Sequence, residues 1–376
     1  MTRVICSRLL PATSLLLLLV VQTTTGNCAP SSARATLESI IQAWNQRQNS
    51  VRSFQLSWEG AEWRVAAVVP GRLRASAGKD LSTETVSYKS HTTIAVDEEG
   101  RTRIERVGAV WDPDVNRLVA SRSFDVISGR THRSFFPDGP TERPAGMGLI
   151  PSGWIDGNVV MSRKTLDLLP IRLVFRPFDE KIGVADRSKL LLTDRQGVVD
   201  GSVCTVIQQG DETFWVDPNR SFVLVRNLCV RRGITARQVD IQYSKGKVTD
   251  WIPTSWTMMS FGGTDGKPVA TTSAKVTECK LNSAIPEATF ELDFPIGAWV
   301  RNSMTNERYI VRDAGKKRPI MPGEFTGSNF EQIRDSEPPG LSRGSKMLIA
   351  GVTVLVFVGA FVLWLVARRR RAALRS

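Results

Sequence analysis

The spacing of apolar residues predicts that the folded part of the chain opens with a helix and a hairpin. Residues 33–49 are expected to form an amphipathic helix, because apolar side chains recur three or four positions apart at Leu37, Ile40, Ile41 and Trp44. From residue 54 apolar and polar positions alternate, which is typical of a half-buried strand. Gly60 predicts a turn, and a second strand is expected at 63–69.

Most of the remaining chain shows the same two-residue period. Clusters of Gly, Pro, Asn and Asp separate the apolar runs and predict turns between them. The further expected strands are 85–96, 101–107, 117–127, 131–136, 202–208, 213–217, 222–231, 237–244, 253–261, 271–281 and 289–294. Residues 137–157, rich in Pro and Gly, are expected to form a long loop.

The strands and two helical segments together predict the fold class. Residues 165–175 are apolar and are expected to form a short covering helix that breaks near Pro170. The prediction is an α+β fold, in the form of a curved antiparallel sheet, or incomplete barrel, covered by one or two helices. This exported domain is expected to occupy residues 33–314, and a flexible spacer rich in Gly, Pro and Ser follows at 323–346.

A C-terminal apolar run predicts a transmembrane helix. Residues 347–367 contain no charge and no proline, and as a helix they would reach about 32 Å, against a hydrocarbon core of about 30 Å. Lys346 precedes the run, and a basic tail at 368–376 follows it, beginning with Arg368, Arg369, Arg370 and Arg371. Because the denser positive charge stays in the cytoplasm, the chain is expected to be a single-pass protein of the cell membrane with its large domain outside the cytoplasm.

The N-terminus predicts the same topology. Residues 1–26 have the order of a secretory signal peptide, in which Arg3 and Arg8 precede an apolar run and a short polar stretch. Cleavage is expected after Gly26, and lipid attachment to Cys28 is the alternative. Both ends of the chain therefore place its bulk on the periplasmic side of the membrane.

The net charge narrows the range of partners. The formal charge of the whole chain is +13, but removing the seven arginines of the signal peptide and the cytoplasmic tail leaves +6 on the exported part. Acidic residues are well mixed into that part, so its surface is mildly basic and lacks the basic stripe of a nucleic-acid-binding protein. We expect the lipid bilayer as a partner and no nucleic acid.

Candidate catalytic residues are few. His91 and His132 lie on different predicted strands, neither is near a nucleophile motif such as G-x-S-x-G, and both are expected at the surface. Glu291 and Asp293 share one face of a predicted strand, as the paired carboxylates of an acid–base catalyst would, although such pairs are common on charged strands. We expect no enzyme activity and no cofactor, and the lack of a C-x-x-C pair argues against structural zinc.

The order of elements resembles the Lol-type carriers of outer-membrane lipoproteins and the related RseB-like periplasmic domain. The likeness is carried by the opening helix with its strand, by Thr213-Phe214-Trp215-Val216-Asp217-Pro218, by Trp251-Ile252-Pro253-Thr254-Ser255-Trp256 and by Phe290-x-Leu292-x-Phe294-Pro295. It covers residues 33–314 and implies an incomplete barrel whose concave face holds acyl chains. This chain is much longer than the carriers, and if it is fixed to a membrane it cannot ferry cargo between membranes.

Apolar residues on the strands are the expected lining of such a cavity. The candidate ligand-binding residues are Phe54, Leu56, Trp58, Trp63, Trp215 and Trp256. The same side chains would also serve as ordinary core between sheet and helix. We expect a membrane-tethered extracytoplasmic protein that holds or senses an acyl chain, a lipoprotein or another apolar ligand. The alternatives are a scaffold or sensor that binds another envelope protein through its sheet edges and loops, and an envelope enzyme without a recognisable motif.

Overall fold

The computed structural model describes most of the chain between residues 36 and 336. The described ranges are 36–65, 85–112, 117–129, 131–138, 146–151, 161–179, 183–247, 250–262, 266–321, 323–324, 332–333 and 336. The predicted signal peptide at 1–26 and the predicted transmembrane helix at 347–367 lie outside these ranges, as do Lys346 and Arg368 to Arg371. Within the described ranges, no helix combines the length and the apolar character needed to cross a membrane.

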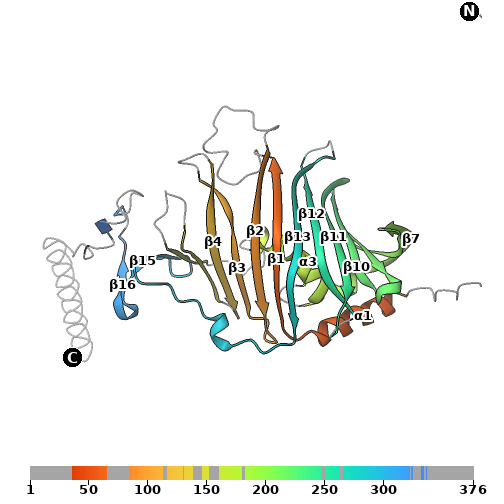
Figure 1. Cartoon of the computed structure of the whole chain (residues 1–376), viewed down its shortest axis with the longest axis horizontal. Coiled ribbons are helices and arrows are strands. Elements are labelled where there is room, and N and C mark those ends of the chain that lie inside the picture. The colour runs from red at the N-terminus through yellow and green to blue at the C-terminus, as the bar shows by residue number, and fades with distance from the viewer. Residues whose placement is uncertain are drawn as a thin grey trace, which may run out of the picture. The chain divides into compact units, whose positions relative to one another are not determined.

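Two α-helices and sixteen strands make up the described fold (Figure 1). The helices are α1 (Leu37–Ser50) and α3 (Met161–Phe175). The strands of the first half are β1 (Phe54–Val65), β2 (Thr85–Val96), β3 (Thr102–Asp112), β4 (Arg117–Ser128), β5 (Thr131–Phe136) and β6 (Met147–Ile150). Those of the second half are β7 (Leu191–Val199), β8 (Ser202–Gln209), β9 (Glu212–Asp217), β10 (Val223–Arg231), β11 (Ile234–Lys245), β12 (Trp251–Phe261), β13 (Pro268–Leu281), β14 (Trp299–Asn302), β15 (Glu307–Val311) and β16 (Lys317–Pro319).

All sixteen strands belong to one sheet, in the order β16-β15-β14-β6-β5-β4-β3-β2-β1-β13-β12-β11-β10-β9-β8-β7. Neighbours are antiparallel except β6 and β14, which are parallel. A parallel pair needs a long crossover connection, and here the whole second meander separates the two strands in sequence. The predicted fold class was therefore wrong: the structure is one very large sheet with two α-helices rather than an incomplete barrel covered by helices, and it gives no support to a C-terminal transmembrane helix.

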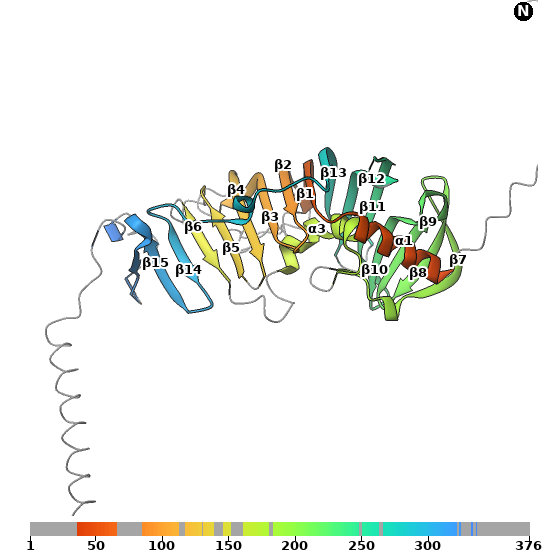
Figure 2. The same ribbon diagram turned by 90° about the horizontal axis from the view of Figure 1, so that it is seen from below.

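The main core lies on one side of this sheet. We call the face that carries Phe54, Leu56 and Trp58 the core face, and the opposite one the outer face. Apolar residues of α1, α3, β1 to β3 and β8 to β13 form a single buried cluster on the core face. Both helices pack against this face (Figure 2). Residues 168–175 of α3 are almost all buried, because this stretch is apolar except for Arg172.

Helix α1 begins at a capping box and ends against a strained turn. Thr36 and Ser39 each accept the other's backbone N–H, which satisfies two donors that the helix itself leaves open. Ser221 and Phe222, just before β10, both have φ of 54°, a left-handed conformation that costs non-glycine residues about 1–2 kcal/mol each. Trp44 Nε1 donates to the Phe222 carbonyl at 2.8 Å, so α1 binds the backbone of this turn.

A long connection crosses the outer face between β13 and β14. This segment comprises residues 282–298. Its residues Phe290 and Leu292 are buried against the outer-face residues Ala95, Val126 and Phe135. The segment contains a short 3-10 helix at Glu287–Phe290 and then extended chain, so the strand predicted at 289–294 was wrong. Its alternation of apolar and polar residues is real, but the apolar side packs onto a sheet face instead of pairing at an edge.

Three other local predictions were also wrong. Strand β1 runs straight through Gly60, where a turn was expected. A Cβ at this position would lie 2.5 Å from the Ser90 hydroxyl of β2, so a larger residue would not fit. The glycine thus serves close packing between strands. Residues 137–157, expected to be loop throughout, contain β6, and α3 continues through Pro170 instead of breaking there.

Candidate functional site

Four of the six predicted cavity residues come together on the core face. Phe54, Leu56, Trp58 and Trp256 are each no more than 4% exposed and belong to the main core. The rings of Trp58 and Trp256 meet edge to face at 5.2 Å between centroids, and Phe54 lies 5.0 Å from Phe175 of α3. In this structure these residues are packed against each other and against α3.

The other two predicted residues lie elsewhere. Trp63 is five positions after Trp58 in the continuous strand β1, and an odd spacing places it on the outer face. Trp215 lies between Phe214 and Val216, which face the main core, and it packs instead with a small outer-face cluster that includes Val223 and Val225. The six residues therefore do not line one cavity. A turn at Gly60 would have placed Trp58 and Trp63 on separate strands, and only the continuous strand β1 shows that they lie on opposite faces.

The apolar part of the core face is bordered by polar residues on β1 to β3. Glu62, two residues beyond Gly60 on the same face, is only 3% exposed. Its carboxylate accepts hydrogen bonds from Tyr88 Oη at 2.5 Å and from Arg64 Nη2 at 2.9 Å, and it also forms an ion pair with Arg106. Burial, and next the Glu62 charge, raise the pKa of Tyr88 to about 12.

The tyrosine pKa values predict how stability depends on alkaline pH. The chain has three tyrosines, and burial raises the pKa of Tyr88, Tyr243 and Tyr309 alike. Because an unfolded tyrosine ionises near pH 10, the stabilisation is complete below that pH and is lost as the pH rises through the folded values. We expect ultraviolet absorbance titration to show little tyrosinate at pH 10 in the folded protein, and Glu62→Gln to lower the pKa of Tyr88. The same apparent pKa in native and denatured protein would contradict this.

A second set of polar side chains, on β9 to β11, borders the apolar core. Glu212 Oε1 accepts from Arg237 Nη2 and Oε2 from Asn227 Nδ2, both at 2.8 Å. Cys229, which pairs in register with both Glu212 and Arg237, is buried, and burial raises the pKa of its thiol. Burial lowers the pKa of Arg172 of α3 to about 10, and the Arg237 charge adds to this lowering.

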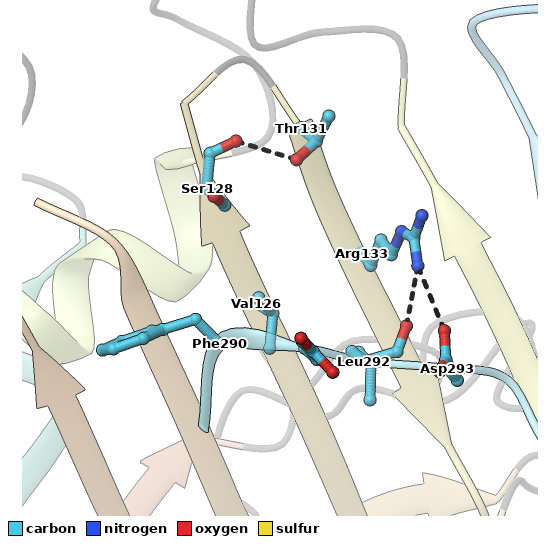
Figure 3. Close-up of a pocket in the computed structure, with 8 residues that line it drawn as sticks. Val126, Ser128, Thr131, Arg133, Phe290, Leu292 and Asp293 are labelled. Atoms are coloured by element: carbon cyan, nitrogen blue, oxygen red, sulfur yellow. Dashed lines mark hydrogen bonds and ion pairs between the residues drawn. The ribbon is translucent and has the colours of Figure 1, made fainter. Parts of the chain in front are cut away.

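A shallow pocket of about 250 Å³ lies on the outer face (Figure 3). The β4–β5 hairpin contributes Val126, Ser128, Thr131 and Arg133, and residues 290–293 form the opposite wall. Arg133 Nη1 donates to the Leu292 carbonyl at 3.1 Å and lies 3.6 Å from Asp293 Oδ1. The predicted carboxylate pair, Glu291 and Asp293, thus lines a pocket. The Asp293 side chain, however, is 94% exposed and is paired with Arg133, which also binds the Leu292 carbonyl.

His132 is buried, although the sequence predicted a surface position, whereas His91 is exposed as predicted. His132 Nε2 lies 3.2 Å from both Asp125 Oδ1 and Ser134 Oγ, and the Ser134 hydroxyl also donates to the same Asp125 oxygen. A Ser-His-Asp relay places the hydroxyl and the carboxylate on opposite ring nitrogens, which is not the arrangement here. Within the described ranges no three His, Cys, Asp or Glu residues are grouped as metal ligands.

Comparison with known proteins gives limited similarity. No family model matches the chain, and no curated protein matches it. Twenty-one chains of solved structures match. One is a DUF1329 family protein from Desulfovibrio piger, with a TM-score of 0.39 and 12% identity over 68% of this chain and 97% of that one. The sheet is large and curved, but no comparison names the Lol or RseB families, so that likeness stays a prediction.

Proposed function

We propose that this chain is an extracytoplasmic binding protein that holds the acyl chain of a lipid or lipoprotein against the core face of its sheet. The observation that supports this is the main core itself. Phe54, Leu56, Trp58 and Trp256 form a continuous apolar floor. The element against it is a helix, α3, and among the described residues no backbone hydrogen bond joins this helix to a strand. An acyl chain offers the same kind of surface as the side chains of α3.

The attachment of α3 differs from that of the strands. Each strand is joined to its neighbours by a ladder of backbone hydrogen bonds. Helix α3 is held by apolar packing and by two arginines at its C-terminal end. Arg172 donates to the Gly183 carbonyl, and the buried Arg176 donates to the Val51 carbonyl just after α1. Pro170 inside the helix removes one backbone donor. Displacing α3 would therefore expose the apolar floor while leaving the sheet intact, at a cost that burial of about 25 cal/mol per Å² of acyl surface can offset.

Two features of the sequence support this proposal. The pattern shared with Lol-type carriers and RseB-like domains spans α1 and β1, and the order of residues 1–26 favours export. We place the domain on the outer side of the cytoplasmic membrane. Protease added to spheroplasts should then digest it, and full protection until lysis would refute this location.

Tryptophan quenching tests the ligand. Bromine quenches indole fluorescence only at short range, so a fatty acid brominated along its chain should quench the full-length protein strongly if it lies on the apolar floor. We expect the double variant Trp58→Phe, Trp256→Phe to lose most of the specific quenching. The matched control is Trp63→Phe, Trp215→Phe, which changes two indoles of the outer face and should keep it.

Equal quenching in both double variants, or no saturable quenching in any of them, would rule out the acyl proposal. The sheet edge would then be the favoured binding surface for another envelope protein. On the edge strand β7, Leu191 is 66% and Val198 is 68% exposed, as in proteins that accept an added strand.

A further inference from the structure

Asn227 is a buried polar residue in an otherwise apolar row of the core face. Its neighbours in register are Phe214 on β9, Val239 on β11 and, one strand further, Met258 on β12. All three belong to the main core, and Asn227 itself is only 1% exposed. A polar side chain at such a place needs hydrogen-bond partners, because its polar atoms cannot reach bulk water.

The amide group of Asn227 has a fixed orientation. Asn227 Nδ2 donates to Glu212 Oε2 at 2.8 Å and to the Thr213 carbonyl at 3.4 Å. Turning the amide over would place its oxygen against these two acceptors, so the nitrogen stays on their side. Asn227 Oδ1 is therefore held on the other side of the amide, where it is buried without a donor among the described residues.

Arg237 supplies an open donor close to this open acceptor. Arg237 Nη2 donates to Glu212 Oε1 at 2.8 Å, while Asn227 uses the other oxygen of the same carboxylate. Arg237 Nε is buried and has no acceptor within the described ranges. Because Asn227 and Arg237 bind one carboxylate, their open atoms are within reach of the same bound molecule.

This pair of atoms matches a neutral hydroxyl group. Glu212 and Arg237 form an ion pair, so their charges cancel and the site has no net charge of its own. A hydroxyl both donates and accepts, so it can donate to Asn227 Oδ1 and accept from Arg237 Nε. A carboxylate only accepts and would leave the Asn227 oxygen without a donor.

The three polar residues all belong to strands, so the site does not depend on α3. The helix packs against β10, and its displacement, as in the proposed function, would uncover this strand with Asn227. The side chains of Glu212 and Arg237 are 24% and 16% exposed, which places them at the border of the buried core. From there Met258 leads to Trp256, two residues along β12 on the same face.

We propose that Asn227, Glu212 and Arg237 bind the hydroxyl head group of a neutral lipid of the acylglycerol kind. The inference rests on the proposed acyl-binding function and adds the chemical class of the head group. A head-group hydroxyl donates to Asn227 Oδ1 and accepts from Arg237 Nε, and the acyl chain runs over Met258 toward Trp256.

Three brominated probes that share one acyl chain test the inference with the full-length protein. They are a monoacylglycerol, the methyl ester and the free fatty acid, and tryptophan quenching gives the affinity of each. The wild type should bind the monoacylglycerol about tenfold more tightly than the methyl ester, which is the ratio that two neutral hydrogen bonds of ordinary strength produce. Apolar packing alone predicts the opposite order, since the methyl ester is the more apolar molecule. The fatty acid should also bind more weakly than the monoacylglycerol.

A conservative variant locates the effect. Arg237→Lys keeps a positive charge facing Glu212 but lacks the Nε donor, so the preference for the monoacylglycerol should fall to about threefold or less. The matched control is Arg226→Lys. Arg226 Nε donates to Asp240 Oδ1 at 2.5 Å in a similar ion pair between strands, but Arg226 pairs in register with Trp215 of the outer face. This control should keep the full preference.

The outcomes separate the two proposals. The head-group inference is overturned if the methyl ester or the fatty acid binds as tightly as the monoacylglycerol, or if folded Arg237→Lys keeps the full preference. The two open atoms then hold water only, and the acyl-binding function stands because a probe has bound. If none of the three probes binds, the acyl-binding function fails and the inference fails with it. The comparison of probes on the wild type needs no variant, so a poorly folding Arg237→Lys would not prevent a decision.

Discussion

Replacing Trp44 by alanine is expected to lower the free energy of unfolding by about 3–5 kcal/mol, the range found for large aromatic truncations in cores. Trp44 is 1% exposed, and its ring meets Phe178 at 5.6 Å and Phe214 edge to face at 6.0 Å. The variant also leaves the Phe222 carbonyl without its indole donor. That carbonyl belongs to the left-handed turn at 221–222, so both the core and the turn that leads into β10 should be weakened. Urea denaturation followed by circular dichroism measures the change.

Two further variants separate these contributions. Trp44→Phe keeps most of the apolar contact but lacks the N–H, and we expect it to cost about 1–2 kcal/mol. Trp63→Ala on the half-buried outer face should cost clearly less than Trp44→Ala. A loss for Trp44→Ala no larger than that for Trp63→Ala would contradict the assignment of Trp44 to the centre of the core.

Replacing Arg176 by methionine is expected to cost about 3 kcal/mol, because the buried side chain donates to several carbonyls at once. Its guanidinium reaches the Val51 carbonyl at 2.5 Å, the Arg52 carbonyl at 2.8 Å and the Phe175 carbonyl at 3.1 Å. These bonds join the C-terminal end of α3 to the end of α1. Methionine fills a similar volume without donors, so the carbonyls are left unsatisfied. Thermal and urea unfolding measure the loss.

The matched control is Arg187→Met. Arg176 lies over the Phe54 ring, with 5.7 Å from guanidinium carbon to ring centroid, and Arg187 lies over the Phe178 ring at 4.9 Å. Arg187, however, is exposed. Its replacement should change stability by less than about 0.5 kcal/mol. Hydrogen exchange should also show faster opening of α3 in the Arg176 variant, since this residue links the helix to α1. Equal effects of the two substitutions would show that the carbonyl contacts of Arg176 contribute little.

Most of the strands could be read from the sequence because their signal is local. The strands at 85–96 and 131–136 were predicted with their observed bounds, and several in the second half differ by a few residues. The alternation of apolar and polar residues sets which residues face the core, and short turns such as Asp217 to Ser221 mark the ends of strands. Both properties depend only on neighbours in the chain.

The failures share a long-range cause. Strands β6 and β14 are four residues long and pair with each other across the sequence between 150 and 299, so neither carries a strand signal of its own. The segment around Phe290 and Leu292 has a strand-like period but packs on the outer face of β4 and β5. His132 is buried because its ring contacts Asp125 of the neighbouring strand β4 and Ser134 of its own strand β5. The contact with Asp125 depends on how the two strands pair, which the sequence of β5 alone does not reveal.

The sequence by itself determined the opening helix, most of the meander and four of the residues on the apolar floor, since these follow from periods of two and three to four residues. Only the tertiary structure decided that Trp63 and Trp215 face away from that floor, that α3 occupies the space against it, and that Glu212, Asn227 and Arg237 meet at its polar border. These features depend on strand register and on contacts between segments far apart in the chain. The free energy of such contacts comes from burial and desolvation, which no local pattern of residues specifies.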